Sequence, residues 1–374
     1  MFLVMVSLHE FGHFITAKLM GFKILEYSIG FGPAIWHSKK SEIQYSIRAI
    51  PFGGYCKFEG EDEASDDERA FSNRPAWQRF IVVAAGGIFN IILGFVLFLL
   101  IVPASSPVRT NVIDQVVPGS YIEELGIQPG DEVVGIDGKK VNFFNDILLY
   151  MQDCSADEEY EIVVKRDGER LKYDFRPTEQ VITYNYTEEG IEVEDSINGV
   201  SQGSEFYKYG EGAVRDDDMI GKSETVTRLL VGFTAATEDV NIKNVWGIAW
   251  DQTRFMVKVV YYSLWQMVTG RVGVDQMSGP VGIVSEVNDA VNSGSGSWLQ
   301  LINLTALLTI NLGVFNLLPI PALDGGRLLF IIVEMIRRKP IPPEKEGLVH
   351  AIGFLLLIAL IIFVSFNDIM RLIR

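Results

Sequence analysis

The sequence predicts a multi-pass α-helical membrane protein with four transmembrane helices, a membrane-associated β-hairpin region and an inserted α+β domain outside the membrane. Three apolar runs without Asp, Glu, Lys or Arg, at 80–102, 298–320 and 348–366, each reach the roughly twenty residues that cross a bilayer. Residues 104–245 contain 13 Lys and Arg against 29 Asp and Glu, so this block alone supplies the net charge of −16. Such a block favours a domain that lies in water.

The first predicted span contains a short polar stretch, "SLHEFGHF" (7–14), inside an apolar run. On a helix, His9 and His13 project from one face and can bind one Zn²⁺, while Glu10 can act as a general base on zinc-bound water. Ionisable groups in a membrane segment are costly and are therefore candidates for function. A helix whose histidines are merely hydrogen-bonded is the alternative that the spacing leaves open. The charged residues and the lack of a small-residue cleavage site argue against a signal peptide.

The segment between the first two spans is predicted to form strands. "EIQYSIRAIPFGGYCKFEG" (42–60) alternates apolar and polar residues and is interrupted at Pro51 and at the pair Gly53 and Gly54. We therefore expect strands and not a helix between the first and second spans.

Charge predicts the orientation in the membrane. Basic residues gather before the second span, from Lys18 to Arg79, and in "RRK" (337–339) before the last span. By the positive-inside tendency these loops are cytoplasmic and residues 104–245 are extracytoplasmic. Cys56 and Cys154 then face opposite sides, so no disulfide is expected. Nothing in the composition suggests nucleic-acid binding.

The extracytoplasmic block divides into two parts. Composition alone predicts a small α+β domain at 104–178, and "EYEIVVKRDGERLKYDF" (159–175) predicts a hairpin about Asp167 and Gly168. Residues 179–245 are an acidic region of unknown fold, in which "TEEGIEVED" (187–195) and "VRDDDMIG" (214–221) look like solvated loops. With these, the chain divides into 1–103, 104–178, 179–245 and 246–374.

A catalytic zinc site usually has three protein ligands. The best third candidate is Asp324, the only carboxylate of "NLLPIPALDGGRL" (316–328), where two prolines must break the helix of the third span. Irregular backbone at membrane depth is acceptable only where it is buried in protein or lines a wet cavity. A helix-terminating turn with a solvated aspartate is the alternative, and His37 and His350 are the only other histidines.

Residues 246–268 could be mistaken for a fifth span. This run contains Asp251, Arg254 and Lys258 together with Trp and Tyr, which suits a helix lying in the membrane interface. His13 and Asp324 reach one metal only if the first and third spans run in the same direction, and this requires 246–268 not to cross.

The two polar stretches together resemble the site-2 protease family of intramembrane metalloproteases, in particular its bacterial branch with one extracytoplasmic PDZ domain. The resemblance rests on "HEFGH" (9–13) in the first span and "NLLPIPALDGG" (316–326) in the third. Further similar stretches are "SIGFGPAIW" (28–36), "YSIRAIPFGGYCKFEGE" (45–61), "FSNRPAWQRF" (71–80) and "SGPVGI" (278–283). One departure is "AAGGIFN" (84–90), which has Gly87 where the family often has proline.

The resemblance implies a zinc-dependent intramembrane endopeptidase of the bacterial cytoplasmic membrane. It implies that His9, His13 and Asp324 bind zinc, that Glu10 activates water, and that residues 104–178 form the PDZ domain, which acts as a size filter. Substrates would be single-pass membrane proteins, such as anti-sigma factors or remnant signal peptides, held extended by β-addition to the hairpin. The candidate substrate-binding residues are Asn316, Pro319, Pro321, Gly53, Gly54 and Asn90.

Two alternatives belong to other functional classes. A membrane zinc transporter would also place His and Asp in helices, but it would need a relay of polar groups through several spans, and the last span offers only His350. A catalytically silent membrane scaffold would not need Glu10.

Overall fold

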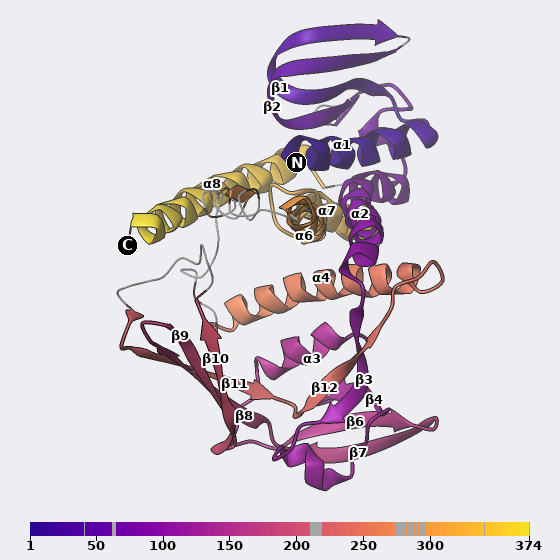
Figure 1. The fold of residues 1–374 in the computed structure, drawn as a ribbon. Helices are drawn as coiled ribbons and strands as arrows, with labels where there is room; N and C mark the ends of the chain where they lie inside the picture. The colour runs from indigo at the N-terminus through magenta and orange to yellow at the C-terminus, as the bar shows by residue number, and fades with distance from the viewer. Residues whose placement is uncertain are drawn as a thin grey trace. The chain divides into compact units, whose positions relative to one another are not determined.

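The structure, a computed structural model, describes residues 1–40, 42–61, 65–209, 219–271, 297–339 and 341–373, with isolated residues 273, 282, 284, 287, 288 and 291. The chain forms two compact units (Figure 1). The first unit comprises Met1–Ala104 and Ile242–Arg374, and the second unit comprises Ser105–Asn241. The second unit is therefore an insertion in the sequence of the first.

The first unit is mainly helical. Its helices are α1 (Phe2–Leu19), α2 (Ala76–Ile101), α4 (Val245–Val268), α6 (Ser297–Leu317), α7 (Asp324–Arg337) and α8 (Pro343–Ile373). Among the described residues, three helical stretches are long and apolar enough to cross a membrane, namely Ala76–Ser105, Trp298–Leu317 and Glu344–Met370. These match the three apolar runs of the sequence. Helices α1 and α4 are not among these three stretches. A fourth span at α1 therefore stays a prediction.

Glycines let α2 approach its neighbours closely. A Cβ on Gly12 of α1 would lie 2.7 Å from the carbonyl oxygen of Ala85 in α2. A Cβ on Gly87 would lie 2.7 Å from the carbonyl oxygen of Gly313 in α6, and a Cβ on Gly313 would lie 2.6 Å from that of Gly87. Small residues at helix crossings bring backbones into contact. Helix α2 stays continuous at Gly87, which serves as a contact point with α6.

The predicted strands between α1 and α2 are present as β1 (Ile24–Lys40) and β2 (Ile43–Phe58), which pair antiparallel. The register shifts along the pair, and one segment of β1 lies between two segments of β2. Tyr27, for example, is paired with Tyr45 on one side and with Cys56 on the other. Gly53 lies at the predicted interruption and has a φ of 91°, a conformation that favours glycine.

A buried apolar cluster joins α1, the two strands, α2 and α7. It consists of Phe14, Ala17, Phe22, Ile24, Cys56, Phe58, Phe71, Val82, Val83, Ala84, Leu328 and Ile331. This cluster packs the C-terminal half of α1 against the strands. It also brings α7, which is distant in the sequence, beside them.

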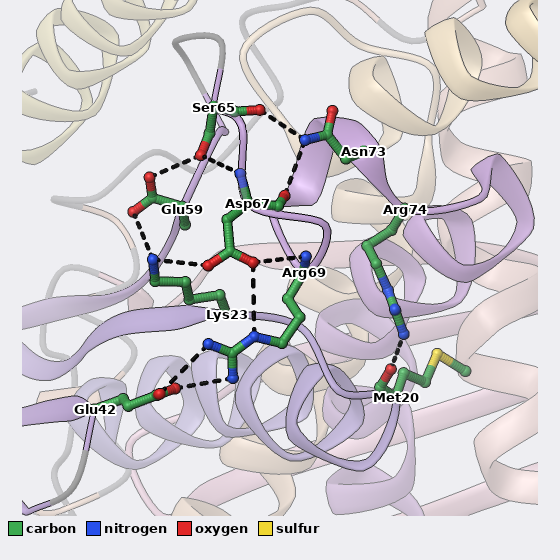
Figure 2. A network of polar contacts seen from close by, with 9 residues as sticks. All are labelled: Met20, Lys23, Glu42, Glu59, Ser65, Asp67, Arg69, Asn73 and Arg74. Atoms are coloured by element: carbon green, nitrogen blue, oxygen red, sulfur yellow. Dashed lines mark hydrogen bonds and ion pairs between the residues drawn. The ribbon is translucent and has the colours of Figure 1, made fainter.

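The connection between β2 and α2 is fixed to the end of α1 by a polar network (Figure 2). Lys23 Nζ lies 2.9 Å from Asp67 Oδ2 and 4.0 Å from Glu59 Oε2. Arg74, just before α2, donates to the carbonyl oxygen of Met20 at the end of α1. The network ties the start of α2 to the end of α1.

The second unit contains two antiparallel sheets. The strands of the first sheet are β3 (Val108–Val116), β4 (Glu132–Ile136), β5 (Lys139–Lys140), β6 (Tyr160–Arg166), β7 (Glu169–Phe175) and β12 (Phe233–Glu238), in the order β12-β3-β4-β6-β7 with β5 beside β4. The short helices η3 (Tyr121–Leu125) and α3 (Phe144–Met151) accompany this sheet. The predicted turn at Asp167 and Gly168 joins β6 and β7, and both residues have positive φ, as this type of hairpin turn requires.

The second sheet lies in the acidic region for which the sequence predicted no fold. Its strands are β8 (Thr178–Tyr186), β9 (Gly190–Ile197), β10 (Val200–Lys208) and β11 (Ser223–Leu230), in the order β10-β9-β8-β11. The expectation of a solvated loop at 187–195 was wrong, because β9 begins within it. Ile191 and Val193 alternate there with acidic residues, a period of two that suits a strand. Most of 214–221 lies outside the described residues.

Candidate metal centre

Three predicted ligands converge in the first unit. His9 Nε2 lies 3.0 Å from Asp324 Oδ2, and His13 Nε2 lies 3.3 Å from the same oxygen. The two Nε2 atoms lie 3.2 Å from each other. Within the described part of the chain, this is the one group of three His, Cys, Asp or Glu side chains placed to hold a metal.

The two histidines lie one turn apart on α1, and both are buried. His13 Nδ1 lies 2.9 Å from the carbonyl oxygen of Val82 in α2 and can only donate to it. This bond places the hydrogen of the neutral ring on Nδ1 and leaves the lone pair of Nε2 directed at Asp324. The backbone of α2 thus selects the tautomer that would offer Nε2 to a metal.

Asp324 is presented by the break between α6 and α7. Helix α6 ends at Leu317, before the two prolines, as the sequence predicted. A Cβ on Gly325 would lie 1.7 Å from the carbonyl oxygen of Leu318, so only glycine allows the chain to fold back this tightly. Ala322 has a φ of 78°, and its N–H donates to His350 Nδ1 at 3.0 Å. His350 of α8 therefore supports the loop that bears Asp324 and is not placed among the three ligands.

The donor atoms fit a zinc ion. Ligands 2.0–2.1 Å from a tetrahedral zinc lie about 3.3 Å apart, close to the three separations found here. Asp324 Oδ2 is buried without a hydrogen-bond partner. Nitrogen lone pairs and a carboxylate oxygen that face one another at this distance repel, and a cation between them removes the repulsion. Both the spacing and the chemistry of this set suit a zinc ion.

Glu10 lies beside this group and is not part of it. The backbone amide of Cys56 in β2 hydrogen-bonds to the Glu10 carboxylate. A Cβ on Gly54 would lie 3.3 Å from Glu10 Cγ and 2.7 Å from the carbonyl oxygen of Ser28. Glycine at this position therefore lets β2 pass directly against the proposed general base.

The remaining predicted site residues lie at different depths. Asn316 is buried near the end of α6, and Pro319 and Pro321 form the turn that leads to Asp324. Gly54 lies in β2 against Glu10, as above, and Gly53 precedes it and faces the ring of Phe31. Asn90 is wholly buried in α2, and its amide lies 3.4 Å from His9 Nδ1, so it contacts a predicted metal ligand. Of the stretch 278–283, only Gly282 lies within the described residues.

Other residues that support the centre were not identified from the sequence. Arg327 of α7 pairs with Glu61 just after β2, and Arg79 of α2 lies 2.5 Å from Glu334 of α7. These pairs join α7 to the elements around α1. Their partners lie 255 or more positions apart in the chain, and no local pattern connects them. The contact of Val82 with His13 could not be predicted from its residue type, because the backbone carbonyl makes the contact.

Comparisons with known proteins cover both units. The sequence model of Peptidase family M50 matches residues 1–360. A Clostridium acetobutylicum protein assigned by name to the zinc metalloproteases is 35% identical over 370 residues, which span 98% of this chain and 94% of that protein. The zinc metalloprotease RasP of Oceanobacillus iheyensis is 29% identical, over 100% of this chain and 97% of that protein. The regulator of sigma-W protease RasP of Bacillus subtilis is 28% identical, over 98% and 96%.

Proposed function

The chain belongs to peptidase family M50, the site-2 proteases, and is a metalloendopeptidase; on that premise we propose that it is a zinc-dependent intramembrane endopeptidase that cleaves transmembrane segments of single-pass membrane proteins. The observation that supports this proposal most is the convergence of His9, His13 and Asp324 within 3.3 Å, with Glu10 beside them. Two of the three proposed ligands, with Glu10, come from α1, and the third comes from the start of α7, more than 300 residues later.

Each residue has a chemical role in this proposal. When bound by His9, His13 and Asp324, zinc supplies Lewis acidity that makes water nucleophilic near neutral pH. The Glu10 carboxylate accepts a proton from the attacking water and then donates it to the amide nitrogen of the leaving peptide. The Cys56 amide holds the carboxylate in place for both transfers.

Substrate presentation depends on the strands beside Glu10. A peptide bond in a helix is occupied by its own hydrogen bonds, so the substrate must be extended before it is cut. Strand β2 passes Glu10 at Gly54, and β-addition to this region would present an extended segment to the centre. Asn316 near the end of α6, with Pro319 and Pro321 in the break that bears Asp324, would limit where the peptide can lie.

The proposed substrates and membrane orientation rest on the relatives, the apolar helices and the charge distribution. A relative is named regulator of sigma-W protease, which favours anti-sigma factors as substrates, with remnant signal peptides as a second group. The three apolar helices indicate a membrane protein. The bacterial relatives favour the cytoplasmic membrane, and the charge distribution favours an orientation with the acidic second unit outside. The sheet of β3, β4, β6 and β7 with α3 suits the expected PDZ domain.

The proposal is tested with the purified full chain in lipid vesicles and a labelled transmembrane peptide. Cleavage should stop after treatment with a zinc chelator and return when zinc is added back. Cleavage that persists in the metal-free protein would contradict the proposal.

The second unit is proposed to act as a size filter. Replacing 105–241 by a short linker should leave cleavage of the small peptide intact and permit cleavage of a substrate that retains a bulky outer domain. Unchanged rejection of the bulky substrate would exclude the filter, while loss of small-peptide cleavage would show that this unit supports the catalytic one.

A further inference from the structure

The side chain of Asn90 is wholly buried in α2 and lies against His9. Its Nδ2 is 3.4 Å from His9 Nδ1, and its Oδ1 is buried without a hydrogen-bond partner. We propose that Asn90 is a positioning residue, whose Oδ1 accepts the hydrogen of His9 Nδ1 and so directs His9 Nε2 at the metal. This inference rests on the proposed zinc site and concerns a residue for which the sequence predicted a substrate-binding role.

The hydrogen-bond inventory leads to this assignment. His9 faces Asp324 with Nε2, and a neutral imidazole that offers the Nε2 lone pair must hold its hydrogen on Nδ1. An N–H group on His9 and the NH₂ group of Asn90 would be two donors facing each other. Turning the Asn90 amide by 180° exchanges oxygen and nitrogen with almost no change of shape. The oxygen that lacks a partner then accepts from His9.

Both histidines are thereby oriented by α2. His13 donates from Nδ1 to the carbonyl oxygen of Val82, and His9 donates from Nδ1 to the side chain of Asn90, two turns further along the same helix. Metal-bound histidines almost always donate their second ring N–H in this way, which fixes the tautomer and the ring orientation. A backbone carbonyl serves one ring and an amide oxygen serves the other.

The packing of α2 explains why Asn90 can reach His9. A Cβ on Gly86 would lie 2.4 Å from His13 Nε2 and 2.7 Å from His9 Cε1, so this face of α2 lies flush with the imidazoles. The Thr309 hydroxyl of α6 donates to the backbone carbonyl oxygen of Asn90 at 3.4 Å. Enclosed between α1 and α6, Asn90 offers no surface on which a peptide could lie.

Two substitutions separate an acceptor from a donor. Asn90→Leu has a similar size and no polar group, so it removes any hydrogen bond to His9. Asn90→Asp can accept from His9 Nδ1 but cannot donate to it. The zinc dissociation constants of the purified full-length proteins would be measured at one pH by competition with a chromogenic chelator. Thermal melting of the metal-free proteins would compare their folds.

We expect Asn90→Leu to bind zinc about 10- to 100-fold more weakly, as is typical when an outer-shell partner is lost, and Asn90→Asp to retain affinity within a few-fold. With saturating zinc, the KM for a transmembrane peptide should not change in either variant. The control Thr253→Val, which alters a buried polar side chain of α4 whose hydroxyl donates to the Ala249 carbonyl oxygen of the same helix, should leave zinc affinity unchanged.

Three results would overturn the inference: wild-type zinc affinity in Asn90→Leu, equally weak binding in Asn90→Leu and Asn90→Asp, or a raised KM with unchanged zinc affinity. The last result would return Asn90 to substrate binding. The absence of zinc binding in the wild-type chain would instead contradict the proposed function itself, so the two failures are distinguishable.

Discussion

The second unit buries a carboxylate, Asp131, and the first unit holds a partly buried one, Asp324, and the two have different partners. In the second unit, Asp131 is 1% exposed, and both of its oxygens accept hydrogen bonds from Arg166 at 2.7 Å. The N–H of Gln128 donates a third bond at 2.9 Å. In the first unit, Asp324 Oδ2 is buried and faces two imidazole nitrogens, at 3.0 and 3.3 Å. A buried charge with its bonds complete stabilises a fold, whereas converging acceptors without donors indicate a site for a cation.

This contrast predicts opposite consequences for loss of a carboxylate. The largest effect on activity should follow Glu10→Gln, because the amide cannot accept the proton of water. Cleavage should fall by about 10²- to 10⁴-fold, the usual range for a general base, while zinc content stays near that of the wild type. Cleavage assays and metal analysis of the same preparation check this. A variant that loses its zinc would make Glu10 a ligand.

Asp324→Asn should lose zinc as well as activity, because a neutral amide is a weaker zinc ligand than a carboxylate. Loss of an outer-shell partner typically weakens metal binding about 10- to 100-fold, and the zinc dissociation constant of this variant should rise by more than that. The melting temperature of the metal-free protein should not fall. Chelator competition measures the first quantity and thermal melting the second. Full zinc affinity in this variant would mean that another residue completes the site.

Asp131→Ala should do the reverse. The substitution leaves Arg166 without its buried partner. It should lower the free energy of unfolding of the second unit by about 3 kcal/mol, the lower end of the range measured when one partner of a buried ion pair is removed. Cleavage of a short peptide should remain, since none of the proposed catalytic residues lies in that unit. Hydrogen exchange of β4 and β6 measures the stability. The double variant Asp131→Leu with Arg166→Met should recover much of the loss, and its failure to do so would assign the effect to packing.

The smallest effect is a pH dependence confined to the second unit. The Arg166 hydrogen bonds hold the pKa of Asp131 below its usual value. A carboxyl whose pKa is lower in the folded state contributes stability above the unfolded pKa of about 3.9 and loses it as pH falls through the folded pKa. Exchange protection of β4 and β6, corrected for the intrinsic rate, should therefore decline below about pH 4. Protection in Asp131→Asn should be lower at neutral pH and show less of this decline; an identical decline would implicate other groups.

Local patterns were informative where one element decides the outcome. The spacing of His9 and His13 places them on one face of α1, and the apolar runs predicted the three membrane-length helices. The interruption at Gly53 and the turn at Asp167 also follow from local conformational preference. In the acidic region the abundance of charge obscured the alternation of Ile191 and Val193, and a strand was taken for a loop.

The sequence by itself determined the residue types proposed as ligands, the helix of the two histidines and the break before Asp324, because helix periodicity and the geometry of proline and glycine act over a few residues. Only the tertiary structure decided that Asp324 meets both histidines, that the Val82 carbonyl selects the tautomer of His13, and that Asn90 lies against His9. It also decided that β12 pairs with β3 across more than 110 residues of chain. These contacts depend on close approach of distant backbones at glycines such as Gly12, Gly87 and Gly313, and the spacing of residues along one chain does not specify which distant backbone will fill the space that a glycine leaves.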